Sequence, residues 1–263
     1  MSTNLVLAAI LLILMIWVGG KKGARSFFAL FLNFIMLLIT VLLMTDPHIN
    51  PIILTFIACT GISAINLFYI NGVNQKTATA FMATMITIAV MLIFILIVTK
   101  KSMIQGFSEE ELEEISIYSL HLGVDFVKIA TSVIIMSTIG SITDVAISIT
   151  SPMQEIFNHQ PKIERRKLFL SGLTIGKDIL GTNTNTLFFA FIGSYMGLLL
   201  WFRDLKYSVG AIANSKVFSD EMLTIFCAGI GIAAIIPIAS WINASHLIKK
   251  RDKNTEQTTS GQI

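Results

Sequence analysis

Long apolar runs alternate with short polar breaks along most of the chain. The first four runs cover residues 4–20, 26–45, 51–70 and 78–99. Three more cover residues 118–142, 187–202 and 222–248. A helix needs about 20 mostly apolar residues to cross a bilayer, and each run is long enough or nearly so. The pattern predicts about seven membrane-spanning helices in one helical domain over residues 1–248.

The segment at residues 168–186 interrupts this regularity. Its apolar stretches are broken by Lys177, Asp178 and the run Thr-Asn-Thr-Asn-Thr that follows Gly181. Irregular backbone is tolerated at membrane depth only where it lines a cavity or is buried in protein. We predict a re-entrant or broken helical segment here, with the backbone break at Gly176 and Gly181. An ordinary capped loop at the membrane surface is the alternative.

Composition supports a membrane class. Apolar residues make up 54% of the 263 positions and charged residues only 13%, against about 25% in an average soluble domain. The mean hydropathy is +0.76 and the formal net charge is +3. These values exclude a soluble globular enzyme, a disordered chain and a nucleic-acid-binding domain. The predicted fold class is all-α, a polytopic transmembrane helix bundle.

The basic residues predict an orientation. If the N-terminus is outside, twelve of the 19 Lys and Arg residues fall in inside segments, five fall outside, and Lys128 and Lys177 fall in membrane segments. This bias obeys the positive-inside rule. The basic cluster after the first run is the reverse of a cleavable signal peptide, so that run is expected to be retained. Residues 249–263 are expected to form a disordered, basic and polar cytoplasmic tail.

One acidic segment separates the fourth and fifth runs, at residues 105–116. Ser108 followed by Glu111 is a capping box, which predicts that a short helix starts there. A solvated helix face is the simpler interpretation. A surface that gathers cations at a pore mouth is the alternative.

Ionisable residues at membrane depth provide the candidate site. They cost roughly 2.5–3.5 kcal/mol each on insertion scales, and they persist where they are paired, hydrated or used. Asp144, Glu155, Lys177 and Asp178 are the main candidates for a substrate or ion. The neutral oxygens of Thr184, Asn185 and Thr186 are expected to line the same site.

A second charged pair precedes these residues. Asp125 and Lys128 are three positions apart, so a helix would place them on one face as an intramembrane ion pair. A proton-relay or ion-coupling role is the alternative. No catalytic residue, metal site or cofactor is predicted, because Glu155 and His159 alone are too few ligands. Cys59 and Cys227 lie in apolar runs and are interpreted as packing residues.

Three stretches carry a resemblance to a known family. They are residues 140–155 (Gly-Ser-Ile-Thr-Asp at their start), residues 171–194 (with Gly-Lys-Asp-Ile-Leu-Gly-Thr-Asn-Thr-Asn-Thr), and Asn214 with Glu221 leading to Ile236 and Pro237. In them the chain resembles the YibE/F-like family of bacterial multi-span membrane proteins. The resemblance covers roughly residues 118–245, while the first four runs match only in general character. Lys177 and Asn183 stand where the family pattern has Arg and Met. The resemblance implies an integral protein of the bacterial cytoplasmic membrane and no settled activity.

These observations lead to a functional hypothesis. We expect a transporter or permease component for a small solute or ion. A non-transporting membrane partner or scaffold is the alternative. No enzyme is expected, because no nucleophile and base occur at a persuasive spacing. The expected partners are the lipid bilayer and either another membrane protein or a second copy of the chain, with no nucleic acid.

Overall fold

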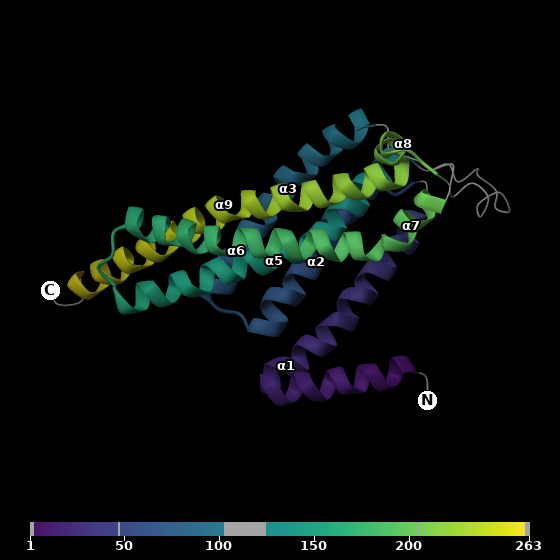
Figure 1. The fold of residues 1–263 in the computed structure, drawn as a ribbon. Coiled ribbons are helices and arrows are strands. Elements are labelled where there is room, and N and C mark those ends of the chain that lie inside the picture. Colours follow the sequence, from purple (N-terminus) through teal and green to yellow (C-terminus); the bar gives the residue numbers. More distant parts are fainter. Residues whose placement is uncertain (1–2, 47, 103–124, 205, 261–263) are drawn as a thin grey trace.

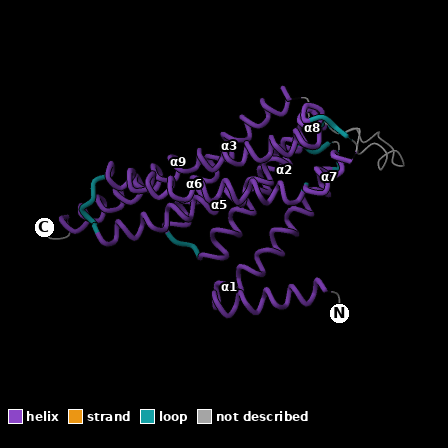
Figure 2. Tube along the Cα trace, in the orientation of Figure 1, coloured by secondary structure: helices purple, strands orange, loops and turns teal. Residues whose placement is uncertain are grey.

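The structure is a computed structural model that describes residues 3–46, 48–102, 125–204 and 206–260. Helices dominate the described trace, and short loops join them (Figure 2). The acidic segment at residues 105–116 and the start of the predicted fifth run, residues 118–124, lie outside the described residues.

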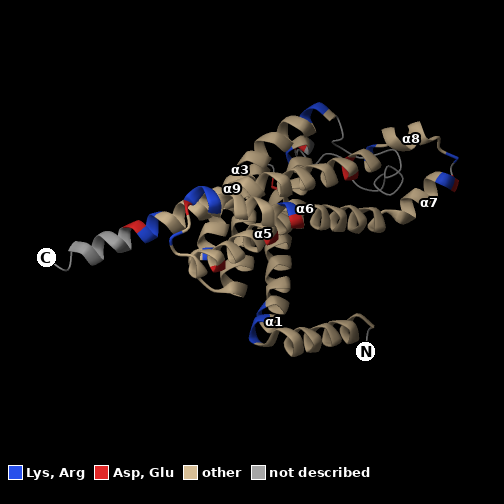
Figure 3. Cartoon of the chain, turned by 60° about the vertical axis from the view of Figure 1, so that its left-hand side comes forward, with Lys and Arg blue, Asp and Glu red and all other residues tan. Residues whose placement is uncertain are grey.

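The first helix, α1 (Thr3–Met44), is bent into two arms. Gly20 has φ 56° and ψ −136°, which is a backbone conformation that glycine adopts readily and other residues do not. Gly23 lies so close to the Met15 carbonyl that a Cβ atom would collide with it. The arms therefore fold back toward each other, with Lys21 and Lys22 at the bend (Figures 1 and 3). They correspond to the first two predicted spans.

The next two helices form a hairpin. Asn50 caps α2 (Pro51–Ala64) by accepting from the Ile52 amide at 3.1 Å, and α2 continues as a five-residue π-helix, η1 (Ile65–Tyr69). Gly72, with φ 75°, makes the turn to α3 (Gln75–Ser102). Asn74 and Thr77 cap the start of α3 reciprocally, because each side-chain oxygen accepts from the other residue's amide.

The remaining helices complete the bundle. They are α5 (Phe126–His159), α6 (Arg165–Ser194), α7 (Met196–Asp204), α8 (Val209–Asn214) and α9 (Lys216–Ser260). Helices α3, α5, α6 and α9 pack into the main core, whereas α1 contacts α2 and η1 at the edge (Figure 1). The short turn at residues 160–164 makes α5 and α6 antiparallel neighbours. Arg251 of α9 holds that turn by donating to the carbonyl oxygens of Pro161 and Ile163, at 3.2 and 3.1 Å.

Small residues set the helix spacing in this core. A Cβ atom at Gly172 would lie 2.6 Å from Met153 Sδ of α5 and 2.6 Å from Ser240 Oγ of α9. A Cβ atom at Gly176 would collide with Ile236 of α9. Helices in membranes associate through close packing of this kind, since lipid tails are as apolar as leucine. The two glycines therefore fix α6 tightly against α9.

Five of the described helices are long and apolar enough to cross a membrane: α1, α2 with η1, α3, α5 and α9. The bent pair α6 and α7, with an angle of 49° between its parts, could be a sixth. The all-α membrane fold is confirmed, whereas the described helices give five or six candidate spans and do not show the predicted seven. The difference arises because α1 joins the first two predicted spans in one kinked helix.

The predicted backbone break at Gly176 and Gly181 is wrong. Helix α6 runs without interruption from Arg165 to Ser194. Its polar side chains bond to their own helix: Asn183 donates to the Ile179 carbonyl at 3.1 Å, and the Thr186 hydroxyl donates to that of Thr182 at 2.8 Å. Such i→i−4 bonds let polar residues stay helical. The bend falls instead at Tyr195, between α6 and α7.

Two other boundaries differ from prediction. Helix α5 continues beyond residue 142 to His159, passing through Pro152. Helix α9 continues to Ser260, where a disordered tail was expected from residue 249. Lysine, arginine, glutamate and glutamine are good helix formers, so this polar composition is compatible with a continued helix.

Candidate functional site

One side of α5 carries a polar stripe. Its members recur every three or four positions and therefore lie on one helix face: Ser137, Ser141, Asp144, Ser148, Ser151 and Glu155. Ser137, Asp144, Ser148 and Glu155 are exposed, whereas Ile142 and Val145 are buried. These four residues thus face away from the core, whereas Ser151 of the same stripe accepts from Lys76 Nζ of α3 at 3.2 Å.

Pro152 adds a backbone oxygen to this stripe. Proline has no amide hydrogen, so the carbonyl of the residue four positions earlier loses its intrahelical donor. That residue is Ser148, one turn after Asp144. A carboxylate and a hydroxyl therefore lie one turn apart on this exposed side, and the carbonyl of Ser148 lacks its usual intrahelical donor.

Helix α6 exposes two charges of its own. Lys177 and Asp178 directly follow Gly176, which is buried against α9, and both side chains are exposed. Gly181 has no neighbouring atom within 4 Å of the place where a Cβ atom would stand. These residues occupy the side of α6 that no other described helix covers.

The charges of α5 and α6 share one level of the bundle. Gly172 packs against Met153, which fixes the register of the antiparallel pair. Asp144 precedes Met153 by nine residues, and Gly181 follows Gly172 by nine residues, so Asp144 and Gly181 lie at equal height. Lys177 is one turn of α6 away from that height. By the same register, Ser148 is level with Lys177.

This level lies midway through the bundle. Asp144 is within two residues of the centre of α5, a helix of 34 residues, or about 50 Å. Helix α9 gives the same height for Asp144. Gly231, near the middle of the candidate span Lys216–Asp252, packs against Ile142, which is two residues before Asp144. A hydrocarbon core is about 30 Å thick. When α5 crosses the membrane, the three charged residues Asp144, Lys177 and Asp178 therefore lie within the hydrocarbon core.

No ion pair joins Asp144, Lys177 or Asp178 to any other residue that the structure describes. At roughly 2.5–3.5 kcal/mol each, three such groups facing lipid would cost about 7.5–10.5 kcal/mol. This is comparable to the whole stability of a typical domain, about 5–15 kcal/mol. Contact with lipid alone does not account for this arrangement, and water or another polar surface has to meet these groups.

The other predicted residues are more dispersed. Glu155 lies three turns from Asp144, near the turn between α5 and α6. Thr184 is half-buried beside Gly229 of α9, whereas Asn185 and Thr186 are exposed further along α6. Asn185 does not cap a helix start, because α6 is continuous there. Within the described residues, no group of three or more His, Cys, Asp or Glu side chains could hold a metal ion.

Asp125 and Lys128 meet at the first turn of α5. Lys128 Nζ lies 3.2 Å from Asp125 Oδ2, and the Asp125 carboxylate also accepts from the amides of Val127 and Lys128. Slight burial raises the pKa of Asp125, but the hydrogen bonds and charge of Lys128 outweigh it and hold that pKa below its usual value. Both side chains are substantially exposed. Asp125 thus acts as a helix cap at the edge of the apolar span.

Asn243 was not among the predicted residues. It is fully buried in α9, accepts from the Thr79 hydroxyl of α3 at 3.1 Å, and donates to the Thr150 carbonyl of α5 at 3.2 Å. A single amide therefore joins three core helices. An asparagine inside an otherwise apolar run is the signal that could have identified it.

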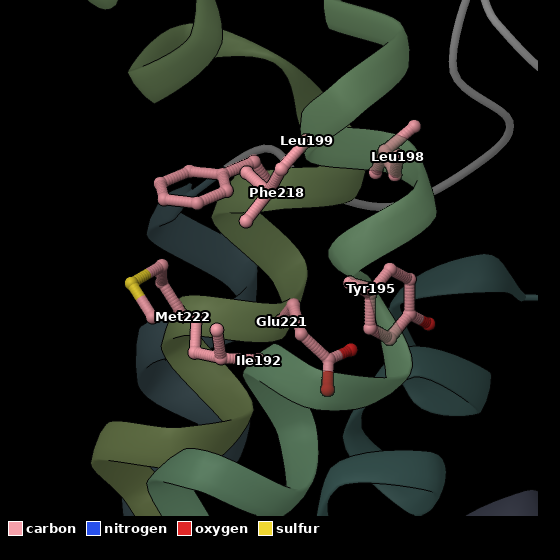
Figure 4. Close-up of a pocket in the computed structure, with 7 residues that line it drawn as sticks. All are labelled: Ile192, Tyr195, Leu198, Leu199, Phe218, Glu221 and Met222. Carbon is pink, nitrogen blue, oxygen red and sulfur yellow. The ribbon is translucent and has the colours of Figure 1, made fainter.

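Glu221 was singled out only through the family resemblance. It lies at the start of α9 in a small pocket beside the α6–α7 bend, and Tyr195 lines the same pocket (Figure 4). The other lining residues are apolar: Ile192, Leu198, Leu199, Phe218 and Met222. The pocket lies between the α6–α7 bend and the start of α9. It is far along the helices from Asp144.

Comparison with known proteins identifies the family of this chain. No curated protein and no solved structure matches the chain. The model of the YibE/F-like protein family matches residues 7–250, which extends the resemblance back through the first four predicted spans. The chain is therefore a multi-span membrane protein that belongs to the YibE/F-like family.

Proposed function

We propose that this protein is a transporter or permease component for a small solute or ion, and that it is not an enzyme. One observation carries the proposal. Asp144, Lys177 and Asp178 lie at similar heights, midway along α5 and α6, and each side chain is exposed on its own helix. Ionisable residues in such positions typically mark substrate or ion pathways.

The chemistry of this level favours a cation. Two carboxylates and one ammonium group leave a net charge of −1 there. The Ser148 hydroxyl and the carbonyl freed by Pro152 add neutral oxygens one turn away. Carboxylate, carbonyl and hydroxyl oxygens are the ligands that hard cations prefer. Lys177 would balance one carboxylate while the other meets the passing ion.

The distribution of basic residues supports an orientation with the N-terminus outside and the C-terminus inside. The α1 bend, the α5–α6 turn and the C-terminal part of α9 lie toward one end of the bundle (Figure 1). Lysine and arginine gather at these places (Figure 3). Cytoplasmic segments carry an excess of such residues, so we assign that end to the cytoplasm.

Accessibility of the polar stripe tests the proposal before a substrate is known. In a Cys59→Ala, Cys227→Ala background, Ser148→Cys should react with a charged, membrane-impermeant thiol reagent in vesicles. Ile93→Cys is the matched control, because Ile93 is 63% exposed on apolar α3 and faces lipid. Equal, background-level labelling of both positions would contradict a hydrated path.

Flux gives the second test. Purified protein in vesicles should conduct protons, sodium or potassium above the protein-free background, and Asp144→Asn should lower that flux. Ile93→Ala, on α3 and outside the stripe, should leave it unchanged. Flux that is equal for the wild type and Asp144→Asn would remove Asp144 from the pathway.

A scaffold role is the second candidate. Gly193 and Gly197 flank the α6–α7 bend, and neither has an atom within 4 Å of its Cβ position. Small residues exposed in this way suit close packing of another membrane helix. If the protein is a scaffold, a single membrane partner should co-purify with it and be lost on Gly193→Leu substitution.

A further inference from the structure

A groove between α3, α8 and α9 belongs to none of the sites described above. Its volume is about 330 Å³, and sites for small molecules span about 300–1,000 Å³. Phe94 and Val98 of α3 form one wall, and side chains of α9 between residues 218 and 230 form the other. Ser219 carries the one hydroxyl among the lining residues, and it donates to the Ala213 carbonyl at 3.0 Å. The lining therefore offers a ligand mainly apolar surface, and we call it the apolar groove.

The apolar groove runs from the middle of the bundle toward one end. Near the middle of the α9 span, a Cβ atom at Gly231 would lie 3.7 Å from Met91 Cε of α3. Ile230, the innermost lining residue of α9, is at this height, and Phe218 lies twelve residues, or about 18 Å, toward the start of α9. Half of a hydrocarbon core is about 15 Å. The groove thus has the length and direction of one acyl chain in a single leaflet.

A lysine continues each wall of the groove at its outer end. Lys101 follows Val98 by three residues and Phe94 by seven, so the three lie on one face of α3. Lys216 precedes Ser219 by three residues and lies on the lining face of α9. Both lysines are exposed, and neither pairs with a carboxylate in the part of the chain that the structure describes. The apolar walls therefore end in two cations.

The two lysines lie at the depth of lipid headgroups. Lys101 follows Met91 by ten residues, or about 15 Å, which is the distance from the middle of a bilayer to the edge of its hydrocarbon core. Lys216 precedes Gly231 by fifteen residues, or about 22 Å, which reaches the headgroup layer. Long lysine side chains extend their charged tips along apolar surface toward such an interface. Both ammonium groups are therefore within reach of one layer of phosphates.

We propose that the apolar groove binds a phospholipid with an anionic headgroup. One acyl chain lies along α9, and the headgroup meets Lys101 and Lys216. Charge complementarity selects this occupant, because every anionic phospholipid carries its charge at this depth and an apolar chain directly beneath it. A helix of a partner protein would need an acidic residue at the same height. This site lies apart from Asp144 and does not depend on transport.

The acidic residues nearby bear on Lys216 more than on Lys101. Helix α3 contains no acidic residue. Asp220, which is half-buried, lies one turn after Lys216, whereas Glu221 lines the other pocket, beside the α6–α7 bend (Figure 4). Replacement of Lys101 alone should therefore weaken lipid binding more than replacement of Lys216 alone.

Native mass spectrometry tests the choice of headgroup. The detergent-purified protein is titrated with palmitoyl-oleoyl phosphatidylglycerol or with phosphatidylcholine that has the same two chains. The first phosphatidylglycerol should bind about tenfold or more tightly than the first phosphatidylcholine, because each lysine near an anionic lipid contributes about fivefold. Equal affinity for the two lipids would overturn the proposal.

Charge variants locate this preference. Lys101→Gln combined with Lys216→Gln should lower the affinity for phosphatidylglycerol to that for phosphatidylcholine, and arginine at both positions should retain the preference. Arg203→Gln combined with Lys206→Gln is the matched control, because it removes two positive charges that do not line the groove. An equal loss in this control would assign the preference to net charge and contradict the site.

Photolabelling locates the acyl chain. In liposomes, phosphatidylglycerol with a photoreactive group at the end of one chain should label residues 218–230. Excess phosphatidylglycerol should suppress this labelling, and excess phosphatidylcholine should not. Labelling of α1, whose apolar side chains are widely exposed, should respond equally to both lipids. Equal competition at residues 218–230 would indicate ordinary boundary lipid, and absence of label there would leave the groove to another occupant such as a partner helix. Either result would refute the proposal.

Discussion

Asn243 of α9 accepts a hydrogen bond from the Thr79 hydroxyl of α3 at 3.1 Å, and both side chains are fully buried. The same amide donates to the Thr150 carbonyl of α5 at 3.2 Å. The three helices thus share one polar junction inside an otherwise apolar core. This junction fixes their relative height, and with it the height of Asp144.

We expect Asn243→Ala to destabilise the protein by about 1–2 kcal/mol, because it removes the two buried hydrogen bonds that join α9 to the Thr79 hydroxyl of α3 and to the Thr150 carbonyl of α5. A double-mutant cycle with Thr79→Val should give a coupling energy of about 0.6 kcal/mol, the average for hydrogen bonds between membrane helices, and at most about 1.7 kcal/mol. Unfolding in mixed micelles measures both quantities. A coupling energy of zero would show that the bond does not join α3 and α9 in the membrane.

Two glycines of α6 should respond oppositely to the same substitution. Gly176→Ala places a methyl group against the branched side chain of Ile236, and such overpacking costs about 1–3 kcal/mol. Gly181→Ala meets no atom within 4 Å and should gain up to about 1 kcal/mol of helix propensity. Thermal unfolding of the two variants checks the sign of each effect. A similar loss in both would contradict the register between α6 and α9.

The bend of α1 depends on Gly20. Its φ of 56° with ψ of −136° costs other residues about 1–3 kcal/mol, so Gly20→Ala should open or straighten the two arms. Gly19→Ala is the control, because Gly19 has no positive φ and no atom within 4 Å of its Cβ position. Spin labels at Val6 and Phe34 would report a longer separation for Gly20→Ala alone. An unchanged separation would show that the bend does not need glycine.

The cap of α5 should be sensitive to acid. Because the folded protein holds the pKa of Asp125 below its ordinary value, the carboxylate contributes stability above the unfolded pKa of about 3.9. That contribution is lost as the pH falls through the lower, folded pKa. Asp125→Ala should cost about 0.5–2 kcal/mol at neutral pH.

Asp125→Asn separates the cap from the charge. The amide oxygen can still accept from the Val127 and Lys128 backbone, so this variant should lose only the smaller ion-pair share. Unfolding measured from neutral pH down to the acid range should show the difference between wild type and Asp125→Asn shrinking with acid. A difference that persists below both pKa values would assign it to something other than ionisation.

The amino-acid sequence determined the membrane class, the apolar runs and the charged candidates. This was possible because bilayer thickness imposes a length and a composition on any spanning helix. Asp144, Lys177 and Asp178 could be selected for the same reason, since charge within an apolar run is costly wherever it lies. The polar stripe of α5 was also present in the spacing of its serines.

Only the tertiary structure decided how these elements combine. Periodicity did not reveal that α6 continues through the Thr and Asn residues after Gly181, because those side chains can bond either to their own helix or to a loop. The equal height of Asp144 and Gly181 follows from the packing of Gly172 against Met153, two residues that no local pattern connects. Asn243 likewise joins α3 and α5 across long sequence separations. The register between helices depends on contacts between distant residues, and such contacts exist only once the chain has folded.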